Sequence, residues 1–174
     1  MEQLAMRWEN DGTKAKEVIA PEGCRIVTLP GLDNGIEKWL DIIQYGLSGG
    51  KENEAYYHKV MTDFPTYSPE RCFFILEGDK AAATITILCD YEKKEGRVHM
   101  VACHPAFRGK GYGTLLTHIA EAALKREGME SATLTTDDWR VPAIKTYLRM
   151  GFLPDLSTDD FKARWEMIMK IING

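Results

Sequence analysis

The chain has 174 residues, of which 44% are hydrophobic and 28% charged, with a formal net charge of -4. This balance supports a globular core and excludes a disordered chain, and the length fits one domain better than two. The negative charge argues against the basic face that nucleic-acid binding requires and slightly favours a cationic small molecule as ligand. No apolar run is long enough to cross a bilayer, and the N-terminus lacks the apolar region of a signal peptide, so we expect a cytoplasmic protein without a membrane partner.

The N-terminal half predicts strands and helices behind a polar segment. Residues 1–23 are mixed and polar and are interpreted as an N-terminal arm, followed by a single domain over residues 24–174. Hydrophobic spacing and Pro or Gly breaks delimit the elements that follow. They are a strand over residues 24–29, helices over 33–50 and 54–64, and strands over 72–76 and 81–88 that join at Gly78-Asp79.

The C-terminal half continues with alternating strands and helices. They are a strand over residues 97–103, a helix from the following Gly-rich loop to Gly128, a strand over 132–136, a short helix from Pro142 to Gly151, a strand at 152–153 and a helix over 159–172. The predicted order is β-α-α-β-β-β-α-β-α-β-α. Such an order predicts an α/β (α+β) fold around a mixed sheet.

The four cysteines indicate no metal or redox site. They are Cys24, Cys72, Cys89 and Cys103. No two of them form a Cys-x-x-Cys pair, so the spacing predicts neither a zinc site nor a redox dithiol. Apolar surroundings favour buried thiols in a reducing compartment.

The segment from Arg108 to Gly113, Arg-Gly-Lys-Gly-Tyr-Gly, lies between a predicted strand and a predicted helix. Backbone N–H groups at a helix N-terminus are unpaired and lie at the positive end of the dipole, and glycines let an anion approach them closely. Arg108 and Lys110 add positive charge. The segment therefore predicts a phosphate-binding loop, although glycines that only form a tight turn remain an alternative.

Two familiar phosphate motifs do not fit this loop. A P-loop requires Gly-Lys followed by Ser or Thr, which is absent. A dinucleotide fingerprint requires a third glycine at position 114, where Thr114 stands.

The loop and its flanks together resemble the GNAT superfamily of acyl-CoA-dependent N-acetyltransferases. Arg-x-x-Gly-x-Gly is similar to the acyl-CoA signature of that family, and residues 101–105, Val-Ala-Cys-His-Pro, resemble its preceding strand. A later helix motif matches at Ala143, Tyr147, Gly151 and Phe152, so the close resemblance covers residues 97–153. Residues 136–144 and Arg164-Trp165-Glu166 resemble a poorly characterised bacterial-type subgroup.

The resemblance implies a fold, a co-substrate and a set of site residues. The fold would be a central, mostly antiparallel twisted sheet flanked by helices, and the co-substrate acetyl-CoA, with no metal. The backbone of Val101 and Cys103 would pair with the pantetheine arm, and Arg140 stands where the family often has Asn. The implied cofactor-binding residues are Val101, Cys103, Arg108, Gly109, Lys110, Gly111, Tyr112, Gly113 and Thr114. Arg140 is expected to bind the cofactor near its phosphates or adenosine, with an exposed surface arginine as the alternative.

Acetyl transfer to an amine needs a base, a polarised thioester carbonyl and a proton for the leaving thiolate. His99 is the candidate base, because it precedes Val101 by two residues and would project from the same strand face; a core or surface histidine without a chemical role is its alternative. The N–H of Val101 could polarise the carbonyl. Tyr147 is the candidate acid, with an aromatic core residue as its alternative. A water relay to Glu77 could replace His99.

Two other histidine and cysteine assignments are less favoured. His104 precedes a proline on the opposite face and is expected to be structural. Cys103 could be mistaken for an acyl-cysteine nucleophile, but no Cys-His-Asp order supports it.

The expected acceptor is a primary amine on an unidentified small molecule, bound by the first two helices and their loop. Their aromatic and acidic residues are Trp39, Tyr56, Tyr57, Tyr67, Glu37, Asp41, Glu52 and Glu54. Two alternatives remain: a protein or peptide N-acetyltransferase, and a non-catalytic acyl-CoA-binding regulatory module. Homodimer formation is left open.

Overall fold

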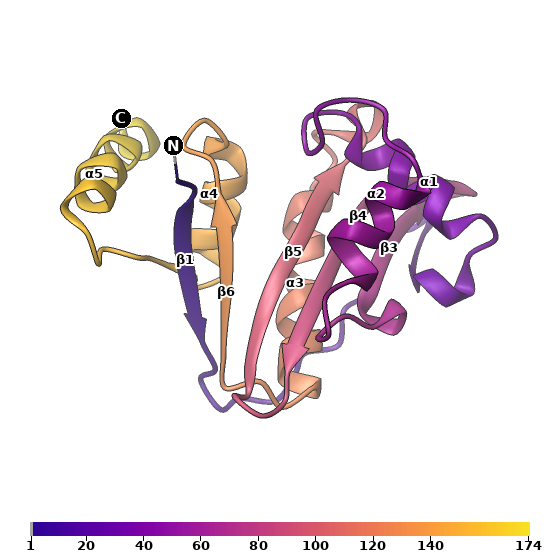
Figure 1. Ribbon diagram of the computed structural model, residues 1–174, viewed down its shortest axis with the longest axis horizontal. Coiled ribbons are helices and arrows are strands. Elements are labelled where there is room, and N and C mark those ends of the chain that lie inside the picture. Colours follow the sequence, from indigo (N-terminus) through magenta and orange to yellow (C-terminus); the bar gives the residue numbers. More distant parts are fainter. Residues whose placement is uncertain (1) are drawn as a thin grey trace.

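The computed structural model describes residues 2–174, which form one sheet with helices on both faces (Figure 1). Its strands are β1 (Leu4–Glu9), β2 (Cys24–Thr28), β3 (Cys72–Glu77), β4 (Lys80–Asp90), β5 (Glu95–Cys103), β6 (Ser131–Thr136) and β7 (Leu153–Pro154). Its α-helices are α1 (Gly35–Ile43), α2 (Glu54–Tyr57), α3 (Tyr112–Arg126), α4 (Val141–Arg149) and α5 (Asp159–Asn173).

The sheet has seven strands in the order β2-β3-β4-β5-β6-β1-β7. All neighbours pair antiparallel except β5 and β6, which run parallel. The predicted mixed α/β fold with a mostly antiparallel sheet is therefore confirmed.

Two hydrophobic clusters cover the opposite faces of the sheet. The larger brings the apolar sides of α3, α4 and α5 together, and its members include Leu116, Ile119, Leu124, Ile144, Tyr147, Phe152, Phe161 and Trp165. The smaller packs α1 and α2 on the other face, and its members include Trp39, Ile42, Ile43, Tyr57, Met61 and Phe74. Successive side chains along a strand point to opposite faces of the sheet, so the strands contribute residues to both clusters.

The expectation of a polar N-terminal arm is wrong for residues 4–9. This stretch is β1, which lies between β6 and β7 and pairs with both. Leu4, Met6 and Trp8 are 0%, 1% and 4% exposed, while Arg7 and Glu9 face solvent. An apolar residue at every second position was the signal for this strand, although the polar residues around it obscured the pattern.

The parallel strands β5 and β6 pair only at their N-terminal ends, at residues 95–97 of β5. Beyond Arg97 they diverge, which Figure 1 shows as a widening space between the two ribbons. A bulge also interrupts β5: His99 pairs with Thr86 and Ala102 with Thr84, so two residues of β5 oppose one of β4. Met100 lies in this bulge with φ of 53°. Such bulges are frequent beside active sites.

The second predicted helix changes its type partway along. Its first turn is α2, and a π-helical turn over His58–Thr62 follows. Asn53 caps the start by accepting a hydrogen bond from the backbone N–H of Tyr56. The helix ends before Pro65, as the sequence predicts.

Candidate active site

A cavity of about 210 Å³ lies where β5 and β6 diverge. Four of the expected site residues line it: the candidate catalytic residues His99 and Tyr147 and the candidate cofactor-binding residues Val101 and Arg140. Sequence reasoning missed the other polar lining residues, which are Gln3, Arg97, Thr135, Thr136 and Asp137. Gln3 and Asp137 come from segments that only the sheet brings together, whereas Arg97 stands two residues before His99 and could have been found from that spacing.

His99 is held in a defined orientation by one hydrogen bond. Its Nε2 atom lies 2.7 Å from the carbonyl oxygen of Val60, and the ring packs edge-on against Phe64. Because a carbonyl oxygen only accepts, Nε2 must carry the proton in the neutral ring, which leaves the lone pair on Nδ1. Burial lowers the pKa of His99; the hydrogen bond to Val60 opposes this shift, and the charge of Arg97 adds to it.

The Val60 carbonyl is available because of the π-helical turn. In the π pattern its partner would be the N–H of residue 65, and Pro65 has none. The N–H of Phe64 bonds instead to the carbonyl of Met61. The carbonyl of Val60 is thereby left for the imidazole of His99.

His99 and Val101 do not share a strand face, contrary to the expectation from a period of two. Val101 packs against the cluster beneath α3, whereas Met100 and Ala102 pack against the cluster beneath α1 and α2. The bulge at Met100 inserts one residue and reverses the alternation. Both residues still line the cavity.

Tyr147 presents a protonated hydroxyl to the same cavity. The side chain is 7% exposed and packs against Phe152. Burial raises its pKa to about 12, with the charge of Arg140 opposing the shift. Within residues 2–174 its hydroxyl has no hydrogen-bond partner. The group therefore stays a phenol at neutral pH and is free to donate a proton.

Arg140 lies close to Tyr147 and lines the same cavity. Its Nη2 donates to the carbonyl of Gly46 at 2.5 Å, and its guanidinium carbon lies 4.7 Å from the centre of the Trp139 ring. Its Nε lies 3.2 Å from a carboxylate oxygen of Asp137, an ion pair whose N–H is not aligned for a hydrogen bond. Arg140 thus joins the loop after α1 to the loop after β6.

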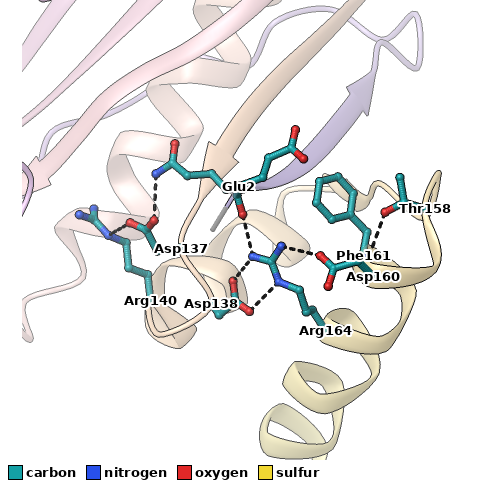
Figure 2. A network of polar contacts seen from close by, with 9 residues as sticks. Glu2, Asp137, Asp138, Arg140, Thr158, Asp160, Phe161 and Arg164 are labelled. Carbon is teal, nitrogen blue, oxygen red and sulfur yellow. Dashed lines mark hydrogen bonds and ion pairs between the residues drawn. The ribbon is translucent and has the colours of Figure 1, made fainter.

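A second arginine anchors that loop to the C-terminal helix, as Figure 2 shows. Arg164 of α5 donates to both carboxylate oxygens of Asp138, to Asp160 and to the carbonyl of Glu2. Its side chain is 10% exposed. The adjacent Asp137 accepts from the amide of Gln3 at 3.0 Å. The two segments 136–144 and 164–166, noted in the sequence, therefore meet beside the cavity.

The Gly-rich loop offers free backbone donors at the start of α3. Gly109 and Gly111 have φ of 78° and 82°, and Gly111 is the residue before the helix. Within residues 2–174 the N–H groups of residues 112–114 have no acceptor, and the first bond runs from Leu115 to Gly111. An added Cβ at either glycine would meet nothing within 4 Å. This open, electropositive surface fits a pyrophosphate.

The charged residues of the Gly-rich loop are engaged with other parts of the protein. Arg108 donates to the carbonyl of Tyr45, and Lys110 binds Glu77 at 2.7 Å. Glu77 also accepts from Tyr112, and Lys110 is the first cause of its lowered pKa. Glu77 does not line the cavity of His99, which argues against the alternative of a water relay to Glu77.

The strand edge beyond Arg97 offers a second set of backbone groups. From Val98 to Cys103, β5 pairs with β4 alone, because β6 has diverged. Cys103 packs partly buried, and burial raises the pKa of its thiol, which disfavours a nucleophilic thiolate. The ring of His104 accepts from the N–H of Ala106 and thus caps a short turn, the structural role expected.

The expected acceptor residues of the first two helices do not line this cavity. Trp39 and Tyr57 are buried in the smaller cluster, and Glu37 and Asp41 line a separate surface pocket beside His104. From the segment of the first two helices, Leu47, which follows α1, lines the cavity.

Residues 2–174 contain neither a membrane-spanning helix nor a metal-binding cluster of side chains. None of their helices combines the length and apolar character needed to cross a bilayer. No group of three or more His, Cys, Asp or Glu side chains in this part of the chain is placed to hold a metal ion.

The sequence is similar to those of known acetyltransferases. The sequence model of the acetyltransferase (GNAT) family matches residues 36–152. N-alpha-acetyltransferase 30 of Xenopus laevis is 30% identical over 90 residues, which are 50% of this chain and 33% of that protein. Mycothiol acetyltransferase of Streptomyces scabiei is 25% identical over 141 residues, which are 79% of this chain and 45% of that protein. The chain thus spans less than half the length of these relatives.

The fold is also similar to that of a solved structure. A GCN5-related N-acetyltransferase from Sphaerobacter thermophilus superposes with a TM-score of 0.66 at 21% identity. The superposition covers 87% of this chain and 48% of that one.

Proposed function

Because this chain belongs to the acetyltransferase (GNAT) family, we propose that it transfers an acetyl group from acetyl-CoA to a primary amine of a small molecule, by direct attack in a ternary complex. One observation carries the proposal. Two groups without partners among residues 2–174, Nδ1 of His99 and the hydroxyl of Tyr147, meet at a single cavity. A base and an acid are the two groups that amine acetylation needs from the protein.

Two sets of backbone groups suit the co-substrate. The free N–H groups at the start of α3 would hold its pyrophosphate, and the unpaired edge of β5 would hold the pantetheine arm. Acetyl-CoA supplies the thioester when bound. The N–H of Val101 lies on the diverging part of β5, where it would donate to the thioester carbonyl oxygen.

His99 would take the proton that the amine loses. Nδ1 carries the lone pair, and the Nε2–H bond to Val60 keeps the ring aligned and stabilises the imidazolium that forms. The lowered pKa keeps His99 neutral, and thus ready to act as a base, at neutral pH.

Tyr147 would complete the proton balance. The new N–C bond forms as the C–S bond breaks, the amine proton goes to His99, and the phenol proton of Tyr147 goes to the leaving thiolate. A phenol with a pKa of about 12 holds that proton until the thiolate develops.

A second candidate acceptor is the N-terminus of a protein. The likeness to N-alpha-acetyltransferase 30, at 30% identity over 90 residues, favours it. The cavity of about 210 Å³ favours a small molecule, because it is smaller than the roughly 300–1,000 Å³ of most ligand pockets.

We also propose that residues 24–174 form a single domain and that the protein is located in the cytoplasm. The four cysteines, Cys24, Cys72, Cys89 and Cys103, are all free thiols, which fits a reducing compartment.

The test is a panel of amines and peptides followed by the release of free coenzyme A. Acetylation of small amines would support the proposal, and acetylation of peptides alone would favour the second candidate. Acetyl-CoA binding in a calorimeter without any turnover would instead indicate the non-catalytic module.

A further inference from the structure

Arg97 places an unpaired positive charge in the cavity beside His99. Among residues 2–174, no carboxylate lies within 4.0 Å of its guanidinium, and its side chain has no hydrogen-bond partner. The other charged lining residues, Asp137 and Arg140, pair with each other at 3.2 Å. The cavity therefore carries a net positive charge in a protein whose formal net charge is -4.

The carboxylates nearest along the strands do not compensate Arg97. Asp90 and Glu95 line the adjacent pocket with it. Asp90 pairs with Lys93, and Glu95 pairs with Arg7, each at 3.3 Å, although Arg7 also pairs with Glu9; neither carboxylate reaches Arg97. The guanidinium is left exposed to solvent between the two pockets.

Arg97 and His99 project from the same face of β5. Both precede the bulge, and Val98 between them is buried in the cluster on the opposite face. Residues two apart on a strand lie about 7 Å from each other. A small molecule can thus reach Nδ1 of His99 with one group and Arg97 with another.

The co-substrate does not account for this charge. The thioester end of acetyl-CoA is uncharged, and the surface that suits its phosphates lies at the start of α3, outside this cavity. A guanidinium fork matches the geometry of a carboxylate and pairs with it through two parallel hydrogen bonds.

We infer that Arg97 binds a carboxylate of the acceptor, so that the acceptor class is small amines that carry a carboxylate. This inference rests on the proposed acetyl transfer and narrows its substrate. The hydroxyl of Thr135 and the amide of Gln3, which bond to each other on the β6 side, line the opposite wall and can bind polar groups of the same molecule. The inferred acceptor differs from the cationic ligand that the overall charge favours.

The experiment compares matched acceptors in wild type and in Arg97 variants. Glycine, β-alanine and 4-aminobutyrate are each paired with their primary amides, which keep the shape and remove the charge. Rates are compared at equal concentrations of the uncharged amine, because the two members of a pair ionise differently. We expect at least one acid to exceed its amide in kcat/KM by about tenfold or more, the worth of a charge-assisted hydrogen bond.

Arg97→Gln should reduce that preference toward unity, mainly through a higher KM for the acid, and Arg97→Lys should keep part of it. Arg126→Gln, an exposed arginine at the end of α3, is the matched control and should keep the wild-type preference. Equal rates for acids and amides, unchanged in Arg97→Gln, would overturn the inference while leaving acetyl transfer intact.

A binding measurement separates this inference from the proposed function. The same acids and amides are titrated by calorimetry into protein saturated with coenzyme A. If no amine is acetylated, the proposed function fails. The difference in binding affinity between the acids and their amides then tests the role of Arg97 by itself. Preference for the acids that is lost in Arg97→Gln would sustain the carboxylate site, and equal binding would overturn it.

Discussion

The Nε2 atom of His99 lies 2.7 Å from the carbonyl oxygen of Val60, and this bond fixes the tautomer of the ring. The carbonyl is free because Pro65, five residues after Val60, has no N–H to offer it. A backbone irregularity in one helix thus orients a side chain on a strand 39 residues further along the chain.

His99→Gln should lower kcat/KM at neutral pH by about 100-fold or more, because a positioned base is removed. In wild type, burial first and the charge of Arg97 second lower the pKa of His99. The activity should therefore rise with pH through an ionisation below about 6.5, the ordinary histidine value. The pH profile of the variant checks this, and an acid limb that persists unchanged would place the titrating group elsewhere.

The same pKa shift links His99 to stability. A folded-state pKa below the unfolded value stabilises the folded protein above about pH 6.5, and this contribution is lost as the pH falls through the folded-state pKa. The melting temperature of wild type should then fall more steeply with acid than that of His99→Gln. Parallel curves for the two proteins would contradict the shift.

Tyr147→Phe should lower kcat and leave the affinity for acetyl-CoA nearly unchanged, because only the proton donor is removed. The loss of stability should be small, since the hydroxyl has no partner among residues 2–174. Tyr91→Phe is the control for turnover, because Tyr91 lies outside the cavity; its hydroxyl bonds to Glu127 and Arg71, so this variant should lose some stability and keep the wild-type kcat. Full turnover in Tyr147→Phe would assign the ring to core packing alone.

Gly111→Ala should abolish the rise in melting temperature that acetyl-CoA produces in wild type. The residue has φ of 82°, so a side chain costs about 1–2 kcal/mol of strain or shifts the loop. Gly128→Ala is a matched control, because this glycine has φ of 74°, equally open surroundings and a place at the other end of α3. The control should lose similar stability and keep the cofactor-induced shift; loss of the shift in both variants would point to a general effect of strain.

Trp8→Ala should reduce the free energy of unfolding by about 3–5 kcal/mol, the usual cost of truncating a large buried aromatic. Trp8 is 4% exposed on β1, inside the sheet. Glu9→Ala, on the solvent side of the same strand, should change stability by no more than about 0.5 kcal/mol. Urea unfolding measures both. An unchanged free energy of unfolding in Trp8→Ala would indicate that residues 4–9 are an arm and not part of the sheet.

Cys103→Ala should retain acetyl transfer, because burial raises the pKa of the thiol and keeps it protonated. The measurement is the release of coenzyme A with the same amine panel. Loss of all turnover, together with an acetylated cysteine in the wild-type protein, would instead support a covalent acyl-cysteine route.

The sequence alone determined the features that are contiguous in the chain. The strand, Gly-rich loop and helix around residues 97–126 follow from local periodicity and from glycine and proline positions, and so does α4 with Tyr147 on its inner side. Periodicity also predicted the helix α5, although its role was not predictable. These features depend on residues within one or two helical turns or within a single strand, where backbone preferences and hydrophobic spacing are sufficient to determine the structure.

Only the tertiary structure decided which distant residues meet. The bond between Gln3 and Asp137 joins positions 134 residues apart, and no local pattern encodes it. The bulge at Met100 overturned the predicted face of His99, because one inserted residue reverses every side chain beyond it. The unpaired charge of Arg97 could be recognised only in the assembled structure, since the pairing of charges depends on how the whole sheet is built: Glu95, on the same strand, pairs with Arg7, which lies 88 residues away in the chain.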